Sequence, residues 1–554
     1  MKANEIISVA VIAACVLAPF FAAAREYFVA TDGDDAADGS AAKPWRTIQR
    51  AADVASAGDT VTIRGGVYRE WVKPENAGRA DAPITYRAAK GEKVVVTGAD
   101  HVRNWTRRPD GLWTAKIRYD TFGGMNPFTE YISGDWFRGN GRKHPRTRLI
   151  HDGKPLVLLD RTVAGRLPPI PKGHAVLVPG IVAGRIVAAF ERDPNDILPE
   201  LVVRPACFYP VATGRDYITV RGITFRDAGP NWAPPTSEQV GVVGTNWSRG
   251  WTIEDCEVSG ASCTGITLGK YGDEFDNVGP TAANYHNTIM RAVSNGLDRV
   301  GHHIVRRCRV TDCGQAGICG SLGAVFSQIE DCEISYCHWR KPFTGDEMAG
   351  IKIHGAVDFT IKCSRIHHCG SIGGIWLDWM AQGTRVSGNI LWENDRDLYF
   401  EVNHGPILVE GNDLLSSIAY GGCSQNIAFV GNRVRGKFKY QNRPKRFTPV
   451  FKPHSVTLDS LDKVSCGSGA HVFVNNILTC DPKFVKETYP SRFEVNWTIP
   501  AEYWKVDEST GEVKITPPAG SCPPGFKPVD VKRLGKPVFV DQEYPAPTIH
   551  RPQL

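Results

Sequence analysis

The sequence predicts an all-β protein, a right-handed parallel β-helix with an inserted β-sandwich domain, and two observations predict this fold. Short apolar segments recur roughly every 23 residues across residues 220–478, which is typical of a solenoid. The composition, with 56 glycines and only 5 methionines among 554 residues, indicates a turn-rich β-protein rather than a helical one. A chain of this length has room for a long solenoid and a second, smaller domain.

The repeat consists of two segments that alternate along the chain. One coil is too small to bury its own apolar face, so coils must stack at strand spacing to build a continuous core. The segments lack the leucine-dominated consensus and helical returns of a leucine-rich repeat. The first segment begins with Gly-Ile and has another apolar residue two positions after the isoleucine. With some variation in sequence, it occurs at 265–269, 317–321, 350–354, 374–378 and 397–401. The second segment occurs at 253–258, 329–334, 386–391, 409–414 and 429–434.

One small polar position in the second segment changes along the chain. It is Cys256 and Cys332 in early coils and becomes Asn389, Asn412 and Asn432 in later ones. Because equivalent positions stack on successive coils, we expect a buried internal ladder of small side chains. The ladder explains these cysteines better than disulfides or metal ligands, since the sequence has no paired C-x-x-C motifs.

The first 24 residues predict an export signal. Lys2 precedes an apolar run over 6–21, and the three alanines at 22–24 form an A-x-A cleavage site. We therefore expect a periplasmic or extracellular protein. A lipobox ending at Cys15 is the alternative, and it would anchor the protein through a lipid. No later stretch has 18 consecutive apolar residues, so we expect no membrane span.

The mature chain divides into four predicted parts. Residues 25–97 form an N-terminal cap and the first coils, in which an amphipathic helix over 44–53 covers the open apolar end of the solenoid. Residues 98–205 lack the coil repeat and form the inserted β-sandwich-like domain. Residues 206–490 form the main β-helix with the active site, and residues 491–554 form a C-terminal β-appendage.

The charge pattern argues against a nucleic-acid partner. The net charge of +6 arises from 65 basic and 59 acidic residues that are interspersed along the chain. A nucleic-acid-binding protein usually concentrates its basic residues in a patch or stripe. The sequence leaves homo-oligomerisation open.

Two carboxylates occupy equivalent positions on consecutive coils. His354, Asp378 and Glu401 end three successive copies of the first segment. Alternation turns the apolar residues between them inward, so Asp378 and Glu401 point outward on one face. Adjacent coils lie roughly 4.8 Å apart, close to the roughly 5–5.5 Å between the carboxyl groups of a retaining glycosidase, whereas inverting enzymes need roughly 6.5–9.5 Å.

The surrounding side chains are those of a sugar-binding site. Tyr399 and two tryptophans offer aromatic faces, and five polar or charged residues offer hydrogen bonds. When two carboxyl groups lie close together, the pKa of one is raised and that of the other stays low. One group can then act as an acid and the other as a nucleophile. The alternative is that Asp378 and Glu401 are ordinary solvent-exposed carboxylates without a catalytic role. The candidate substrate-binding residues are Trp376, Trp379, Lys352, His354, Gln382, Arg385 and His404.

Several motifs resemble the β-xylosidases of glycoside hydrolase family 120. The resemblance rests on the runs 375–386 and 396–406, together with 69–74, 207–211, 232–236, 246–251 and 349–354, and it extends from about Tyr27 to at least Asn432. It implies a β-helix flanked by a β-sandwich. It also implies an exo-acting, retaining β-xylosidase that degrades β-1,4-xylo-oligosaccharides derived from xylan.

The resemblance further implies roles for individual residues. The family nucleophile falls on Asp378 and the acid/base on Glu401, while a glutamate lining the subsite of the cleaved sugar falls on Glu347. The family's His-Glu pair at that place is replaced here by Asp346 and Glu347. The double-displacement chemistry needs no metal or other cofactor.

Three alternatives remain. A retaining glycosidase of different sugar specificity would use the same carboxylate pair. A β-helix polysaccharide lyase would need acidic calcium ligands and a basic residue such as Lys352 or Arg385. A non-catalytic carbohydrate-binding β-helix would keep the aromatic residues without stacked carboxylates.

Overall fold

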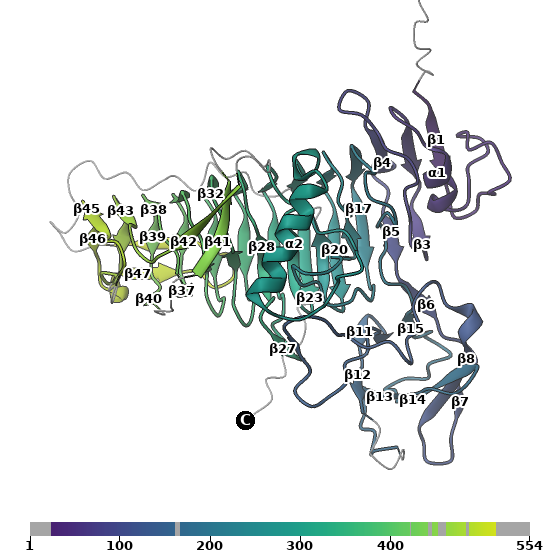
Figure 1. The fold of residues 1–554 in the computed structure, drawn as a ribbon. Coiled ribbons are helices and arrows are strands. Elements are labelled where there is room, and N and C mark those ends of the chain that lie inside the picture. Colours follow the sequence, from purple (N-terminus) through teal and green to yellow (C-terminus); the bar gives the residue numbers. More distant parts are fainter. Residues whose placement is uncertain are drawn as a thin grey trace, which may run out of the picture.

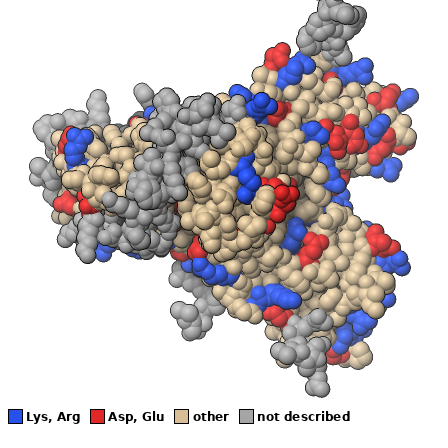
Figure 2. Space-filling model, in the orientation of Figure 1, with Lys and Arg blue, Asp and Glu red and all other residues tan. Residues whose placement is uncertain are grey.

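The computed structural model describes residues 24–160, 167–421, 423–440, 446–451, 461–482 and 487–516. The expected export signal and Cys15 lie outside the described residues, as does most of the expected C-terminal appendage. In the described part of the chain, no helix has the length and apolar character needed to cross a membrane. Acidic and basic side chains are interspersed on the face drawn in Figure 2.

Three long parallel sheets run along the protein and form the walls of a β-helix (Figure 1). The first sheet has the order β1 (Glu26–Val29), β2 (Thr60–Ile63), β4 (Ile84–Ala88), β16 (Ile218–Arg221), β19 (Thr252–Glu254), β22 (Ile304–Arg306), β25 (Gln328–Glu330), β29 (Thr360–Lys362), β32 (Thr384–Ser387), β35 (Ile407–Glu410), β38 (Ile427–Val430), β43 (Val472–Val474) and β45 (Arg492–Glu494).

The second sheet has the order β3 (Gly66–Tyr68), β5 (Val94–Thr97), β17 (Ile223–Arg226), β20 (Glu257–Ala261), β23 (Arg309–Cys313), β26 (Glu333–Ser335), β30 (Arg365–His367), β33 (Ile390–Trp392), β36 (Asp413–Leu414), β39 (Arg433–Val434), β44 (Ile477–Leu478) and β46 (Trp497–Thr498). The third sheet has the order β18 (Val243–Gly244), β21 (Thr264–Thr267), β24 (Ala316–Ser321), β28 (Ala349–His354), β31 (Ile375–Asp378), β34 (Leu398–Glu401), β37 (Ile418–Gly421) and β40 (Phe438–Tyr440). The predicted all-β parallel β-helix is confirmed.

The core of the β-helix is continuous along the solenoid. Ile375 and Leu377 of β31 pack with Leu398 and Phe400 of β34 in one buried cluster that extends over successive coils. These are the residues predicted to face inward, so the side chains that alternate with them on the same strands point outward.

A ladder of small polar side chains runs inside the solenoid. Asn412 donates from its amide to the Val386 carbonyl and to Asn432 Oδ1, and its Oδ1 accepts from the Asn389 backbone, all at 2.8–2.9 Å. In earlier coils the same column holds cysteines, where the Cys308 backbone donates to Cys332 Sγ at 3.5 Å. Cys256, Cys308 and Cys332 of this column are free thiols, as the ladder interpretation predicted.

A short helix covers the N-terminal end of the solenoid. Helix α1 (Ile48–Val54) begins after Thr47, whose hydroxyl accepts from the Arg50 backbone. Ile48, Ala51 and Ala52 are buried in the main core cluster. The helix lies at the extremity of the β-helix in Figure 1, where it shields apolar edges from water.

Residues 98–205 contain two sheets beside the β-helix, in which most neighbouring strands are antiparallel (Figure 1). One has the order β11 (Lys154–Pro155), β10 (Leu149–His151), β15 (Glu200–Val202) and β6 (Ala99–His101), and the other has the order β12 (Val157–Leu159), β13 (His174–Val178), β14 (Ala183–Ala189), β8 (Trp113–Arg118) and β7 (Thr106–Arg107). Leu149 and Leu201 of the first share a buried cluster with Ala175 and Ile186 of the second. The 3-10 turn η1 (Tyr119–Thr121) follows β8.

Two further segments bear on the site. Strand β9 (Phe137–Arg138) of the inserted region pairs antiparallel with β27 (Thr344–Gly345), which belongs to a loop of the β-helix. Helix α2 (Ala282–Ser294), followed by η2 (Leu297–Arg299), lies in an excursion between β21 and β22. Helix α2 is not among the elements predicted from the sequence.

The coils continue beyond residue 490, where the appendage was expected to begin. Strands β45 and β46 still extend the first two sheets. The turn η4 (Ala501–Tyr503) and an antiparallel hairpin of β47 (Trp504–Val506) and β48 (Val513–Ile515) follow. A second hairpin, β41 (Arg446–Phe451) with β42 (Leu461–Cys466), projects between two coils.

Candidate active site

The two candidate catalytic carboxylates lie side by side on the third sheet. Asp378 ends β31 and Glu401 ends β34, and the two residues are direct register partners in the parallel pairing. His354 at the end of β28 is in turn the register partner of Asp378. Neighbouring strands in a sheet lie roughly 4.8 Å apart, so the side chains of the three residues project from adjacent coils in one row.

This row forms one wall of a cavity of about 720 Å³. Four parts of the chain contribute to the cavity: the third sheet, the loop before β28, the inserted region and the start of α2. Such a volume is in the range of a site that encloses a small ligand. The lining residues are Trp136, Arg138, Pro280, Ala282, Tyr285, Asp346, Glu347, His354, Ile372, Trp376, Asp378, Trp379, Arg396, Tyr399 and Glu401.

A buried ammonium group lies between two carboxylates at the inner end of the cavity. Lys352 Nζ is 2.7 Å from Asp378 Oδ2 and 3.3 Å from Glu347 Oε2. All three side chains are at most 6% exposed. Because charges shielded from water are weakly screened, a single ammonium compensates poorly for two carboxylates, and the cluster favours one negative charge over two.

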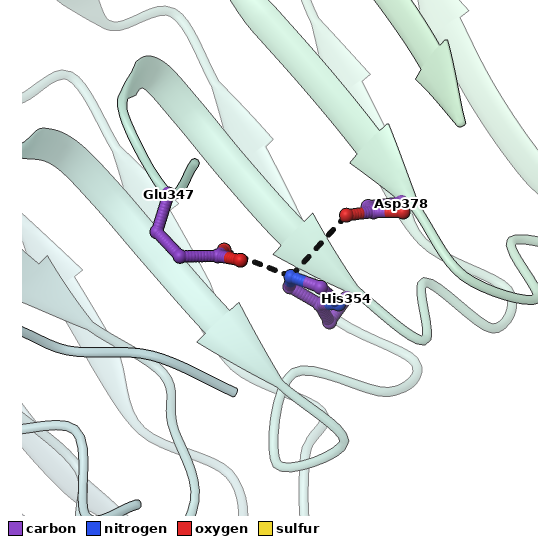
Figure 3. Close-up of side chains that lie close together, drawn as sticks. All are labelled: Glu347, His354 and Asp378. Atoms are coloured by element: carbon purple, nitrogen blue, oxygen red, sulfur yellow. Dashed lines mark hydrogen bonds and ion pairs between the residues drawn. The ribbon is translucent and has the colours of Figure 1, made fainter. Parts of the chain in front are cut away.

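His354 joins the same cluster. Its Nε2 is 2.9 Å from Glu347 Oε2 and 3.5 Å from Asp378 Oδ2 (Figure 3). Burial and the neighbouring Lys352 ammonium hold the pKa of His354 well below its usual value. Burial raises the pKa of Glu347 to about 7, although Lys352 opposes this shift. Near neutral pH the imidazole is therefore uncharged and Glu347 is partly protonated.

The two oxygens of Asp378 have different surroundings. Oδ2 faces Lys352 and His354, whereas Oδ1 is buried and has no hydrogen-bond partner among the described residues. A buried oxygen without a partner is costly unless the site uses it. The ion pair with Lys352 fixes the carboxylate so that Oδ1 is the oxygen left for chemistry.

Aromatic side chains surround this charged cluster. Lys352 Nζ lies 2.9 Å from the centroid of the Trp376 ring, which shields the ammonium from water and adds a cation–π attraction. Trp376 packs edge-on against Tyr399, with 5.1 Å between ring centroids. On the opposite side of the row, Tyr285 of α2 contacts Trp379 and His354, each at 5.0 Å between ring centroids. Aromatic faces of this kind suit the apolar C–H faces of a pyranose ring.

Three of the candidate substrate-binding residues lie away from the cavity. Arg385 is on β32 in the first sheet, where its guanidinium donates to Glu410. Gln382 is buried and donates to the Met380 carbonyl, and neither it nor His404 lines the cavity. The chain turns sharply after Asp378, with positive φ at Trp379 and Met380, so residues beyond this turn belong to the next face of the solenoid. The placement of Arg385 and Gln382 at the substrate is corrected for this reason.

The other candidate substrate-binding residues lie at the cavity or directly beside it. Glu347, His354, Trp376 and Trp379 line the cavity with the two candidate catalytic carboxylates. Lys352 lies directly behind this wall, with its ammonium against Asp378.

Residues from distant segments complete the site and were not predicted. Trp136 and Arg138 come from the inserted region, and Tyr285 comes from α2. Arg138 forms an ion pair with Asp346 at the cavity rim. Nothing in the local sequence patterns of these residues connects them to the row of His354, Asp378 and Glu401, which lies 69 to 265 positions further along.

Three donor atoms of the cluster are close enough to share a cation. One atom each from Glu347, His354 and Asp378 lie within 4.8 Å of one another. Lys352 Nζ contacts both carboxylates and supplies a positive charge at this place from within the chain.

A parallel β-helix with two outward carboxylates in an aromatic-lined cavity has the features of a carbohydrate-cleaving enzyme. A family model for the right-handed β-helix region matches residues 240–440, and one for the glycoside hydrolase 120 insertion domain matches residues 102–156. The structure of XylC in complex with xylose is 34% identical in sequence, with a TM-score of 0.77 over 86% of this chain and 84% of that chain. The chain belongs to glycoside hydrolase family 120, as its motifs predicted.

Two curated proteins match shorter stretches. The uncharacterized protein YwoF of Bacillus subtilis (strain 168) is 39% identical over 71 residues, and pectate lyase PEL9 of Emericella nidulans is 38% identical over 79 residues. These matches cover 13% and 14% of this chain and 15% and 19% of the two proteins. The chain therefore spans less than a fifth of either curated relative, and neither match carries an assignment of activity.

Proposed function

We propose that the protein is an exo-acting, retaining β-xylosidase that hydrolyses β-1,4-xylo-oligosaccharides by double displacement. The observation that carries this proposal is the direct register pairing of Asp378 with Glu401 on adjacent strands. Strand spacing of roughly 4.8 Å favours the short carboxyl separation of retaining enzymes over the roughly 6.5–9.5 Å that an inverting enzyme needs to admit a water.

In the first step, Asp378 Oδ1 attacks the anomeric carbon and forms a glycosyl ester. The bond to the leaving oxygen breaks, and Glu401 transfers a proton to that oxygen. In the second step, Glu401 removes a proton from water as the water attacks the anomeric carbon, and the electron pair of the ester bond returns to Asp378.

The surroundings of Asp378 support its role as the nucleophile. Lys352 and His354 face Oδ2, so the buried Oδ1 is the atom available to a sugar in the cavity. The cavity of about 720 Å³ is in the size range of a site that encloses a small ligand, which suits the end of an oligosaccharide better than the middle of a long chain. Xylose as the preferred sugar follows from the family membership and from the xylose complex of XylC.

The test is to follow p-nitrophenyl β-D-xyloside hydrolysis by NMR and to identify the anomer released first. β-Xylose released by the wild type, with activity abolished in Asp378→Ala and Glu401→Ala, supports the proposal. A matched control is Glu410→Gln, which changes a carboxylate on the first sheet outside the cavity and is expected to keep normal activity. α-Xylose as the first product would refute the retaining mechanism.

Two other outcomes would favour the alternatives. Hydrolysis of other β-glycosides but not of xylosides would keep the mechanism and change the sugar. Unsaturated products from an acidic polysaccharide, detected by their ultraviolet absorbance, would identify a lyase. We also propose export from the cytoplasm on the basis of residues 1–24, and N-terminal sequencing of the mature protein tests it.

A further inference from the structure

The cluster behind the nucleophile contains one ammonium for two carboxylates, and this stoichiometry has a consequence for the reaction. Lys352 Nζ is 2.7 Å from Asp378 Oδ2 and 3.3 Å from Glu347 Oε2. The ammonium is thus already placed between its two partners, and a small rotation of the lysine side chain changes which carboxylate it contacts more closely.

The negative charge on Asp378 is not constant through a double displacement. When Oδ1 forms the ester bond, the carboxylate becomes neutral, and the charge returns only when water breaks that bond. A buried ammonium without an anionic partner is strongly unfavourable, so the Lys352 side chain needs a carboxylate beside it at every stage of the reaction. The site therefore needs a second anion when the ester is present.

We propose that Lys352 is a positioning residue that pairs with Asp378 while the nucleophile is ionised and shifts its ion pair to Glu347 while Asp378 carries the glycosyl ester. This inference rests on the proposed function, because it takes Asp378 as the nucleophile. Glu347 passes its proton to solvent water in the cavity as the ester forms and takes one back from water as the ester is hydrolysed, so the buried cluster keeps one compensating negative charge throughout.

The groups that face Glu347 are consistent with this exchange. Lys352 and His354 on β28 contact it directly, and a carboxylate oxygen of Asp378 on β31 lies within 4.8 Å of it. Tyr285 on α2 and Cys319 on β24 also lie near enough to interact electrostatically. Burial raises the pKa of both groups above their usual values, to about 12 for Cys319, so both stay neutral near pH 7.

Three of the groups that face Glu347, namely His354, Tyr285 and Cys319, therefore stay neutral while the ester forms and is hydrolysed. His354 is uncharged near neutral pH because its pKa is depressed, and it offers Glu347 a hydrogen bond in either protonation state of the carboxyl. Glu401 is on β34 and lines the same cavity. Glu347, with a pKa raised to about 7 by burial, is the group in direct contact with Lys352 that can gain or lose a proton near neutral pH.

The experiment measures the pKa of Glu347 by 13C NMR of protein labelled at the glutamate side-chain carboxyl, with Glu347→Gln to assign the signal. Asp378→Asn imitates the uncharged nucleophile without any reaction. The expected result is a pKa at least one unit lower in Asp378→Asn than in the wild type, and a pKa restored to or above the wild-type value in Asp378→Asn/Lys352→Met. An unchanged pKa in Asp378→Asn, or the same pKa with and without Lys352, would overturn the proposal.

A second arm separates this inference from the proposed function. The wild type is treated with 2,4-dinitrophenyl 2-deoxy-2-fluoro-β-D-xyloside, and peptide mass spectrometry locates the adduct. An adduct on Asp378 together with a lowered pKa of Glu347 supports both. An adduct on Asp378 with an unchanged pKa refutes the charge exchange alone, and an adduct on another residue refutes the proposed nucleophile and this inference with it.

Discussion

Arg138 of the inserted region forms an ion pair with Asp346, the residue that directly precedes Glu347 in the active site. The contact is reinforced by the antiparallel pairing of β9 with β27. A segment more than 200 residues earlier in the chain therefore sets the rim of the cavity. The inserted region therefore helps to line the candidate active site that also holds Asp378 and Glu401.

This contact leads to a prediction for substrate binding. Arg138→Gln is expected to raise KM for xylobiose by up to about tenfold, the equivalent of about 1.4 kcal/mol in binding. The melting temperature should change little, because the two side chains are 59% and 43% exposed and exposed ion pairs contribute at most about 1 kcal/mol. Steady-state kinetics and thermal unfolding measure the two effects. Arg142→Gln, which breaks the ion pair with Asp160 away from the cavity, is the control and should leave KM unchanged.

The assignment of Glu401 predicts a dependence on the leaving group. Glu401→Gln should lower kcat/KM for xylobiose by about 10²–10⁴-fold, since general acid catalysis contributes this much when the leaving oxygen is a poor leaving group. The loss should be much smaller for 2,4-dinitrophenyl β-D-xyloside, whose leaving group needs no proton. Equal losses on both substrates would contradict the role of Glu401 as the acid.

The elevated pKa of Glu347 predicts how stability depends on pH. The protonated form is favoured in the folded protein, so the stabilisation it provides is complete below the unfolded pKa near 4.5 and is lost as pH rises toward about 7. Glu347→Gln removes this loss. Relative to the wild type, the variant should gain about 3 kcal/mol between pH 4 and pH 8. Urea unfolding at the two pH values measures this gain, and a constant difference would contradict the raised pKa.

The internal ladder predicts which coils tolerate substitution. Asn412→Ala removes four side-chain hydrogen bonds in a buried column and should lower the free energy of unfolding by about 3 kcal/mol. Cys332→Ala in the same column removes a thiol with weaker hydrogen bonds and should cost about 1 kcal/mol. Chemical denaturation compares the two variants. A larger loss for Cys332→Ala would mean that packing rather than hydrogen bonding dominates the column.

The repeat allowed the fold and the relative placement of the two candidate carboxylates to be predicted from sequence. Inward positions must be apolar for the coils to stack, so the outward face of each strand follows from alternation alone, and equivalent positions on successive coils must lie about one strand spacing apart. The row of His354, Asp378 and Glu401 could therefore be placed from sequence, and the structure has these residues in register.

Tertiary structure alone decided what surrounds that row. The sharp turn at Trp379 and Met380 moves Arg385 to another sheet, where it pairs with Glu410, and periodicity does not reveal such a change of direction. Contacts from the inserted region and from α2 join segments far apart in the chain, and no local pattern encodes them. The position of Lys352 between Asp378 and Glu347 also depends on the tertiary structure. Interactions between these charges become strong only because the fold shields them from water.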